Sequence, residues 1–158
     1  MSAKATPHLT EKNAEQNYEL EAQIGFVLRR AHQRHVAIFA DCLADLSLTP
    51  QQFSALAKVR EEGAVSQNHL GRLTAMDPAT ILGVVQRLVQ RGLVDRSPDP
   101  SDPRSTRVTL TAAGTELVAS AIPKAVDATN RTLARLTSVQ RKELLHLLGK
   151  LADGEEES

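Results

Sequence analysis

The sequence predicts a mainly α-helical fold with one small β-hairpin and with long helices at both ends. Three observations predict it. Apolar residues recur at helical spacing through most of the chain, a proline-rich segment separates two short runs of alternating apolar and polar residues, and capping residues precede the helices. The chain has 158 residues, which is enough for one domain with its own core plus a helical extension.

The first long helix is predicted from Glu19 to Leu46, after a polar arm that comprises residues 1–18. Its apolar residues share one face: Leu20, Ile24, Val27, Leu28, Ala31, Ile38, Phe39, Cys42, Leu43 and Leu46. A stripe of this length exceeds what a small domain can cover. We therefore expect residues 19–47 to contribute to a dimer interface.

Two shorter helices follow, separated by a short extended segment. The first is predicted from Gln51 to Arg60, and Gly63-Ala64-Val65 forms the crossing. Ser66 then caps the next helix, whose first backbone N–H groups can bind phosphate. We expect three residues at this start to position a nucleic-acid backbone without reading its sequence: Ser66, Gln67 and Asn68. Capping alone would also explain Ser66.

A further helix begins at Asp77, whose carboxylate can accept hydrogen bonds from the first backbone N–H groups, and Pro78 suits the first helical position. Its buried stripe is formed by four residues at helical spacing: Ile81, Val84, Val85 and Leu88. The opposite face combines small residues with an amide and a guanidinium: Ala79, Thr80, Leu82, Gly83, Gln86 and Arg87. Such a face fits a DNA major groove, and an ordinary surface helix is the alternative.

A hairpin is predicted after this helix. Gly92 ends the helix because glycine tolerates the left-handed conformation, and Leu93–Arg96 alternates apolar with polar residues as a strand does. The segment Ser97–Pro103 contains three prolines, so we expect it to lie outside the strands as an exposed tip. Strand-like alternation resumes at Arg107–Leu110.

Two charged residues stand two positions apart at the tip. The carboxylate of Asp102 can hold the guanidinium of Arg104 by charge-assisted hydrogen bonds and present it to a narrow minor groove. Arg107, on the returning strand, belongs to the same predicted surface. The alternative is an ordinary exposed ion pair worth about 0–1 kcal/mol. Its position directly after the groove-fitting helix favours a DNA-binding wing.

Several residues of this region recur in a specific spacing: Gly92-Leu93-Val94, Arg96, Asp99-Pro100, Asp102-x-Arg104 and Leu110-Thr111-x-x-Gly114. The pattern resembles the winged helix of MarR-family transcriptional regulators. The similarity extends upstream through Leu48-Thr49-Pro50-Gln51-Gln52-Phe53 and Leu56, and in outline it covers residues 20–152. Two positions depart from the family pattern, because Gly83 replaces a larger polar or basic side chain and Ser101 replaces a common wing arginine.

The resemblance implies a winged helix-turn-helix domain at residues 48–110. It also implies a transcriptional repressor that binds double-stranded DNA, at a palindromic operator, as a homodimer. A two-fold symmetric dimer matches a palindrome because each subunit reads one half-site.

Two helices are predicted after the hairpin, and they complete the dimerisation region at residues 111–152. Thr111 caps the first, and Pro123 is expected to kink or break it. Thr137 or Ser138 caps the second, which is rich in leucine up to Leu151. Leucine on more than one face implies burial from two sides, in a dimer or in an intramolecular helical core. Residues 153–158 form an acidic tail.

Composition gives only partial support to a nucleic-acid partner. The formal net charge is zero, which counts against one. Residues 66–107 nonetheless carry six arginines against four aspartates, and the planar arginine fork suits phosphate and guanine. These arginines are Arg72, Arg87, Arg91, Arg96, Arg104 and Arg107. One cysteine cannot form an internal disulfide, and no apolar run reaches the roughly 20 residues that span a bilayer, so we expect a cytoplasmic protein without a membrane partner.

Cationic and aromatic side chains cluster on the first helix, where His32 and His35 lie three residues apart with arginines beside them. In MarR-like proteins a small anionic aromatic often binds between the dimer helices and the winged domain. The resemblance therefore implies a site for an aromatic carboxylic acid, for which the candidate residues are Arg29, His32, His35, Phe39 and Phe53. The chain also resembles the branch that represses nicotinate degradation and answers to a hydroxylated pyridine carboxylate. Alternatively, His35 is simply a hydrogen-bonded residue of the apolar stripe.

Other functions would use other residues. A metal sensor would use the histidines His32, His35, His69 or His146, although a pair three residues apart does not suffice. A thiol sensor would use Cys42, which lies in the apolar stripe beside Asp41 and fits a buried structural cysteine better. No nucleophile elbow, phosphate-binding glycine loop or metal motif supports an enzyme, and we expect neither metal nor cofactor. A protein-interaction module would be indifferent to duplex DNA.

Overall fold

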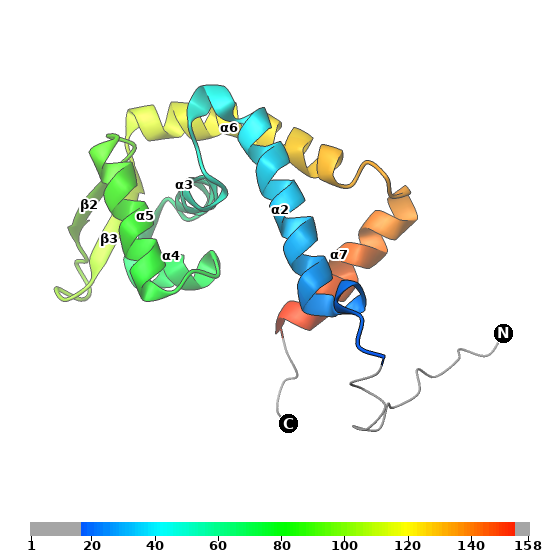
Figure 1. Cartoon of the computed structure of the whole chain (residues 1–158). Helices are drawn as coiled ribbons and strands as arrows, with labels where there is room; N and C mark the ends of the chain where they lie inside the picture. The colour runs from blue at the N-terminus through cyan, green and yellow to red at the C-terminus, as the bar shows by residue number, and fades with distance from the viewer. Residues whose placement is uncertain (1–16, 154–158) are drawn as a thin grey trace. The chain divides into compact units, whose positions relative to one another are not determined.

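The computed structural model describes residues 17–153 of the chain (Figure 1). These residues form two compact units, one ending at Arg34 and one beginning at His35, and α2 contributes to both. No helix in the described part is long and apolar enough to cross a membrane. The elements follow in this order: η1 (Leu20–Ala22), α2 (Ile24–Cys42), η2 (Ala44–Leu46), α3 (Pro50–Glu62), β1 (Ala64–Ser66), α4 (Gln67–Leu73), α5 (Pro78–Gln90), β2 (Val94–Pro98), β3 (Thr106–Leu110), α6 (Ala112–Thr132) and α7 (Ser138–Asp153). The predicted mainly helical fold with a small sheet is confirmed.

The first helix is shorter than predicted. It spans 19 residues, and a separate 3₁₀ turn lies at each end in place of one continuous helix from Glu19 to Leu46. Gln23 is extended (φ −81°, ψ 135°) and separates η1 from α2, whereas Ser47 adopts the left-handed conformation (φ 50°) after η2. Leu43 still packs into the core between α2 and η2, so the apolar pattern continues beyond the helix itself.

Side-chain caps begin the helices of the second unit. Three caps predicted from the sequence are present as named, Ser66 for α4, Asp77 for α5 and Thr111 for α6, and of the two candidates for α7 the cap is Thr137. In α3, Thr49 Oγ1 accepts from the backbone N–H of Gln52, and Gln52 Oε1 accepts from the backbone N–H of Thr49. This reciprocal box satisfies two donors that the helix itself leaves without partners. Thr137 and Gln140 repeat the box at α7.

The sheet contains three antiparallel strands in the order β1-β3-β2, one more than the predicted hairpin. The predicted crossing at Gly63–Val65 supplies β1, in which Val65 pairs with Val108. The prediction that Ser97 and Pro98 lie outside the strands is wrong, because β2 continues to Pro98, which pairs with Thr106. β2 is an edge strand and Pro98 is its last residue, so the missing proline donor costs no central hydrogen bond.

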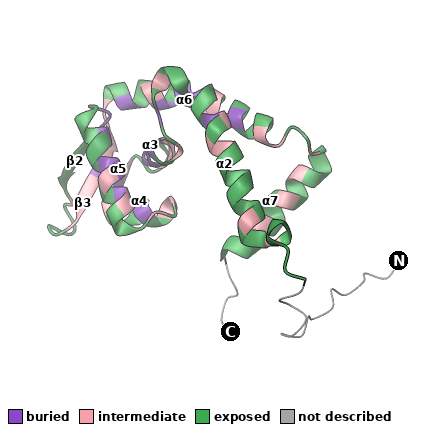
Figure 2. Ribbon diagram, viewed as in Figure 1, coloured by how far each residue is buried: buried purple, intermediate pink, exposed green. Residues whose placement is uncertain are grey.

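The core lies between α3, α5, α6 and the sheet (Figure 2). All four residues of the predicted α5 stripe are buried there: Ile81, Val84, Val85 and Leu88. The sheet meets α6 at Gly114, because a Cβ atom at that position would overlap the carbonyl oxygen of Leu93. Glycine is therefore the residue that allows this close approach.

The two C-terminal helices differ from each other. α6 continues through Pro123, so the predicted break is absent, and it buries Val118, Ala121 and Ala128. α7 buries none of its residues fully. Leu144 and Leu148 are half-buried, and its other large apolar side chains are exposed: Val139, Leu145, Leu147 and Leu151. Within the described part of the chain, α7 is therefore not covered by an intramolecular core.

Candidate nucleic-acid interface and ligand site

The predicted reading face of α5 is largely open. Ala79, Gln86 and Arg87 are exposed, and Leu82 is 37% exposed. Thr80 is half-buried, and its hydroxyl donates to Asp77 Oδ2 at 2.7 Å. That hydrogen bond, together with one from the Thr80 backbone N–H, lowers the pKa of Asp77. The start of α5 thus carries a carboxylate held in its charged form, which limits Thr80 as a donor to DNA.

Gly83 lies in the middle of this face without an intramolecular reason for being glycine. A Cβ atom there would meet only Arg87 Nη1, at 3.9 Å. At Gly71, in contrast, a Cβ would lie 3.1 Å from both Ile81 Cγ2 and the Met76 carbonyl oxygen. Glycine inside a helix costs about 0.5–1 kcal/mol relative to alanine. No contact within the described chain therefore requires glycine at position 83.

The three residues predicted to position phosphate lie differently at the start of α4, and their contact with DNA stays a prediction. Ser66 Oγ accepts from the His69 backbone N–H at 3.3 Å, and Asn68 is exposed. Gln67 is half-buried, and its Oε1 is buried without a hydrogen-bond partner in the described structure. Gln67 therefore turns its amide oxygen toward the protein.

The wing tip is ordered by two aspartates that bind backbone N–H groups. Asp102 Oδ1 accepts from the Arg104 backbone N–H at 3.1 Å, whereas it lies 3.7 Å from Arg104 Nε. The expected hydrogen bond between carboxylate and guanidinium is therefore absent, and a longer ion pair replaces it. The Arg104 side chain is 95% exposed. It projects from a fixed loop and can reach a partner.

Ser101, which departs from the family pattern, has a structural role in the same tip. Its backbone N–H and its hydroxyl both donate to Asp99 Oδ1, at 2.9 and 2.7 Å. These two hydrogen bonds lower the pKa of Asp99. Serine thus helps to build the turn at a position where an arginine would add charge.

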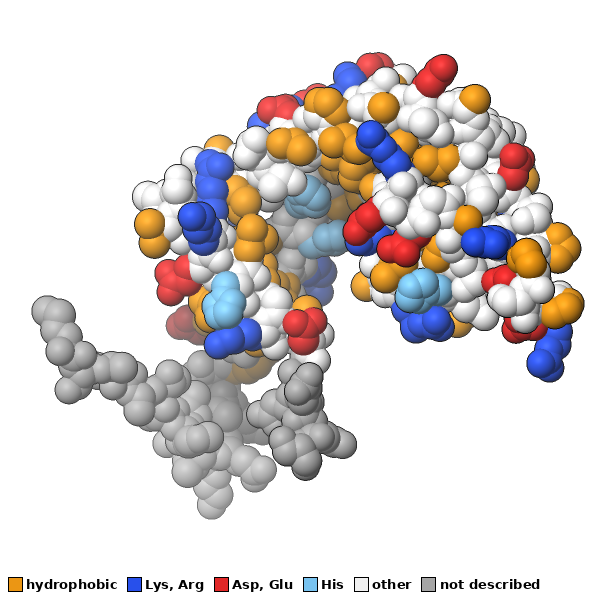
Figure 3. Space-filling model, turned by 180° about the vertical axis from the view of Figure 1, so that it is seen from behind, with side chains coloured by type: hydrophobic (Ala, Val, Ile, Leu, Met, Phe, Trp, Pro, Cys, Tyr) orange, Lys and Arg blue, Asp and Glu red, His pale blue; other side chains and the backbone are white. Residues whose placement is uncertain are grey.

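Only some of the arginines of residues 66–107 belong to the wing. Arg96, which belongs to the family pattern but not to the predicted DNA-contacting residues, lines a hollow of about 360 Å³ together with Arg104 and Thr106. Arg107 is half-buried in β3, opposite Ser66 and Ser97. Basic and acidic side chains are interspersed on the face shown in Figure 3. Because the formal net charge of the whole chain is zero, any attraction to DNA rests on individually placed side chains more than on a field of one sign.

Three of the five predicted ligand residues lie together. The rings of His35 and Phe39 are 6.1 Å apart between centroids, and those of Phe39 and Phe53 are 5.7 Å apart. Phe39 is buried, so its ring packs against His35 and Phe53 and is not open to a ligand. The other two candidates fall in the first unit, where Arg29 lies 5.5 Å from the centroid of the Phe26 ring and His32 is exposed. Their part in a ligand site stays a prediction.

The tautomer of neutral His35 follows from its hydrogen bond. His35 Nδ1 lies 2.9 Å from Thr132 Oγ1, and that hydroxyl donates its only proton to the Ala128 carbonyl oxygen at 2.7 Å. Nδ1 must therefore donate, which makes Nε2 the acceptor of the neutral ring. His35 therefore makes the hydrogen bond that the structural alternative predicted. Its Nε2 has no hydrogen-bond partner among the residues described.

Phe53 also lines a hollow of about 390 Å³ that the sequence did not reveal. Its lining combines apolar residues with hydroxyls and one lysine: Phe53, Ser54, Ala57, Lys58, Leu73, Thr74 and Ala75. Lys58 Nζ lies 2.7 Å from Glu61 Oε2, a hydrogen bond that raises the pKa of the lysine. A lysine five residues after an aromatic residue was the available sequence signal. The hollow itself depends on α4, which no local pattern places there.

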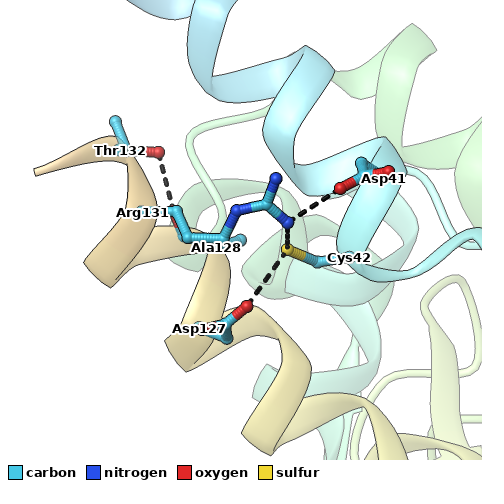
Figure 4. A network of polar contacts seen from close by, with 6 residues as sticks. All are labelled: Asp41, Cys42, Asp127, Ala128, Arg131 and Thr132. Carbon is cyan, nitrogen blue, oxygen red and sulfur yellow. Dashed lines mark hydrogen bonds and ion pairs between the residues drawn. The ribbon is translucent and has the colours of Figure 1, made fainter. Parts of the chain in front are cut away.

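The cysteine lies in a polar network (Figure 4). Cys42 Sγ donates to Asp127 Oδ2 at 3.5 Å and accepts from Arg131 Nη1 at 3.1 Å. Arg131 Nη1 also lies 2.8 Å from Asp41 Oδ2, and this hydrogen bond contributes most to raising the pKa of the guanidinium. Cys42 is half-buried and not fully buried as expected. Among residues 17–153, no group of three or more histidines, cysteines and carboxylates could hold a metal ion, which gives the metal-sensor alternative no support.

Comparisons with known proteins agree on one family. The MarR family profile matches residues 48–106. The chain is 40% identical over 156 residues to the HTH-type transcriptional repressor NicR of Pseudomonas putida, which covers 99% of this chain and 98% of the relative. A probable transcriptional regulator from Pseudomonas aeruginosa superposes with a TM-score of 0.81 at 45% identity, over 84% of this chain and 99% of that one.

A third similar protein is regulated by a small molecule. Bordetella bronchiseptica BpsR superposes with a TM-score of 0.83 at 41% identity, over 87% of this chain and 99% of that one. The DNA binding of BpsR is regulated by 6-hydroxynicotinic acid.

Proposed function

Because the chain belongs to the MarR family, whose members are DNA-binding transcription factors and not enzymes, we propose that it is a homodimeric repressor released from a palindromic operator by a small aromatic acid. The observation that carries the DNA-binding part is the placement of two surfaces. The open face of α5 presents Gln86 and Arg87, and the wing presents a 95% exposed Arg104 from a hydrogen-bonded tip.

The two surfaces suit different parts of a duplex. An α-helix fits the major groove, where an amide reads adenine and a guanidinium reads guanine. An exposed arginine on a narrow projection fits the minor groove, whose negative potential is greatest where the groove is narrow. Ser66 and Asn68 at the start of α4 then contact phosphate and fix the register.

A homodimer would cover the apolar surface that the described chain leaves open. Leu145 and Leu151 of α7 are 58% and 64% exposed, and Tyr18 and Ile24 of the first unit are 64% and 61% exposed. Exposed apolar side chains in such number are typical of an interface. A two-fold dimer would also place two copies of α5 in successive major grooves, about 34 Å apart.

We propose a hydroxylated pyridine carboxylate as the effector, by similarity to BpsR. In the second unit, Phe53 offers an aromatic face, His35 Nε2 can accept from a ring hydroxyl, and Lys58 can pair with a carboxylate. The acid would favour a state in which the two recognition helices no longer match successive grooves. Release is then a population shift whose size equals the difference in affinity for the two states.

The test combines a binding assay with a release assay. Duplexes selected by the protein from a random pool are used in gel shifts at several salt concentrations, with and without 6-hydroxynicotinic acid. Two compounds serve as controls: nicotinic acid, which lacks the hydroxyl, and 2-hydroxypyridine, which lacks the carboxylate. We expect salt-dependent binding and release by the complete acid. Absence of duplex binding would contradict the repressor and favour a protein-interaction module, whereas binding without release would contradict the effector alone.

The ligand site is tested by calorimetry with 6-hydroxynicotinic acid. We expect His35→Ala to weaken acid binding, while His146→Ala, at an exposed histidine of α7, leaves it unchanged. Normal uptake by the His35 variant would assign that histidine to structure alone.

A further inference from the structure

Arg91 lies at the end of α5, and its guanidinium binds backbone carbonyls of a distant segment of the chain. Its Nη1 donates to the carbonyl oxygen of Ser47 at 2.8 Å, and its Nη2 donates to the carbonyl oxygen of Leu46 at 3.0 Å. The guanidinium thus holds the segment Leu43–Leu48, here called the α2–α3 turn. The sequence grouped Arg91 with the arginines of a DNA surface, and the structure corrects that interpretation.

The α2–α3 turn is also held by α6. Lys124 Nζ lies 3.0 Å from Asp45 Oδ2, while Arg131 pairs with Asp41 just before the turn. Leu43 and Leu48, at the two ends of the turn, are buried in the core. The end of α2 is therefore connected by cations to both the recognition helix and α6.

Arg91 is not needed to seat α5. The four residues of the buried stripe are at most 2% exposed, and the helix packs on α3, α4 and β2. In residues 17–153, no other hydrogen bond or ion pair joins α5 to the α2–α3 turn. Arg91 therefore determines how α5 is positioned relative to the α2–α3 turn.

The geometry of the contact suits this role. A planar guanidinium that donates from two nitrogens to two successive carbonyls fixes direction as well as distance, which a lysine ammonium does not. The accepting Ser47 is in the left-handed conformation (φ 50°, ψ 43°), so the carbonyls belong to a defined reversal of the chain. A displacement of either partner must move the other or break both hydrogen bonds.

We infer that Arg91 is a positioning residue that couples the end of α2 to the recognition helix. Its use in effector release rests on the proposed effector, and its test with DNA rests on the proposed contact between α5 and DNA, whereas the hydrogen bonds between Arg91 and the turn rest on neither. Because coupling is reciprocal, DNA bound at α5 must stabilise the α2–α3 turn through Arg91, whatever the effector is.

The first experiment needs no effector. Amide hydrogen exchange is measured for wild type, Arg91→Ala and Arg91→Lys, free and bound to a selected duplex, with Arg60→Lys as control at an exposed arginine of α3. In wild type and control, we expect DNA to slow exchange at Leu46 and Ser47 about fivefold or more. In Arg91→Ala that change is lost while slowing within α5 persists, and Arg91→Lys is intermediate. Equal slowing of the turn in wild type and Arg91→Ala, or none in wild type, overturns the inference.

The second experiment measures regulation. The ratio of operator dissociation constants with and without 6-hydroxynicotinic acid is determined for the same proteins, together with acid affinity. In wild type, we expect the acid to raise the operator dissociation constant about 5- to 150-fold. In Arg91→Ala, this ratio should be smaller by at least about threefold, while the affinity for the acid is retained. An unchanged ratio in Arg91→Ala overturns the role in release. A ratio of one in wild type contradicts the proposed effector, and the exchange experiment then decides on the coupling.

Discussion

The helices α5 and α7 have similar lengths, 13 and 16 residues, but the chain covers the apolar residues of only one of them. In α5, Val84 and Leu88 are 2% and 1% exposed, whereas Leu145 in α7 is 58% exposed. The same apolar spacing thus produces a core helix in one region and an unpartnered helix in the other. Periodicity identifies which residues must be covered, and the rest of the fold determines whether the same chain covers them.

The largest expected effect compares a buried leucine of α5 with an exposed leucine of α7. Leu88→Ala should lower the free energy of unfolding by about 2–5 kcal/mol, because it leaves a cavity in the core. Leu145→Ala should change it by less than about 0.5 kcal/mol at protein concentrations where the chain is monomeric. Urea denaturation measures both. A large loss from Leu145→Ala under these conditions would show that α7 is covered by its own chain.

The next prediction concerns what covers α7. Leu145→Asp should weaken self-association about 100-fold, because a buried carboxylate lacks a partner in an apolar interface. Sedimentation equilibrium measures the effect, and Glu143→Asp, which retains an exposed carboxylate on the same helix, is the control. If the variant remains a dimer, residues of α7 other than Leu145 form the contact or the dimer forms elsewhere.

A smaller effect is expected at the wing. Arg104→Ala should weaken operator binding about tenfold, because it removes a cation from the proposed minor-groove contact. Self-association and acid binding should not change. The comparison is a gel shift at moderate salt against Arg60→Ala, and equal operator affinities would eliminate the proposed wing contact.

Gly83→Ala is expected to separate folding from DNA binding. The added methyl should stabilise α5 by about 0.5–1 kcal/mol, since it meets no atom of the described chain closely. Operator affinity should nevertheless fall about fivefold, because the methyl occupies the groove-facing surface. Gly149→Ala, in α7, is the control for helix stabilisation. A more stable variant with unchanged affinity would place Gly83 outside the DNA contact.

The smallest effect concerns the cap of α5. Hydrogen bonds from Thr80 lower the pKa of Asp77, so its contribution to stability is present above the unfolded pKa and is lost as pH falls through the folded one. Asp77→Asn cannot titrate. The difference in Tm between wild type and this variant, followed by circular dichroism, should therefore shrink as the pH is lowered below about 4. A difference that stays constant down to pH 3 would show that the cap does not depend on charge.

Local features of the fold were predictable, and contacts between distant segments were not. Asp77, Ser66 and Thr111 cap helices within three residues, so sequence spacing is sufficient to find them. β1 pairs with β3 across more than 40 residues, and three residues between two helices give no separate strand signal.

The same distinction applies to the candidate sites. The exposed face of α5 follows from helical period alone. Arg91 was grouped with the DNA-facing arginines because its partners, the carbonyls of Leu46 and Ser47, lie more than 40 positions away. The hollow beside Phe53 was missed because α3 and α4 build it jointly.

The proline that ends β2 also affects how separate molecules meet. An edge strand exposes backbone donors and acceptors that can pair with the edge of another sheet and start aggregation. Pro98 offers no donor at the outer end of β2, and Asp95 and Arg96 put exposed charges along it. Two wings brought close together in solution therefore meet an edge that is one donor short and carries exposed charges, which makes it a poor template for joining strand to strand. The edge that carries the wing is protected from self-association while Arg104 remains accessible.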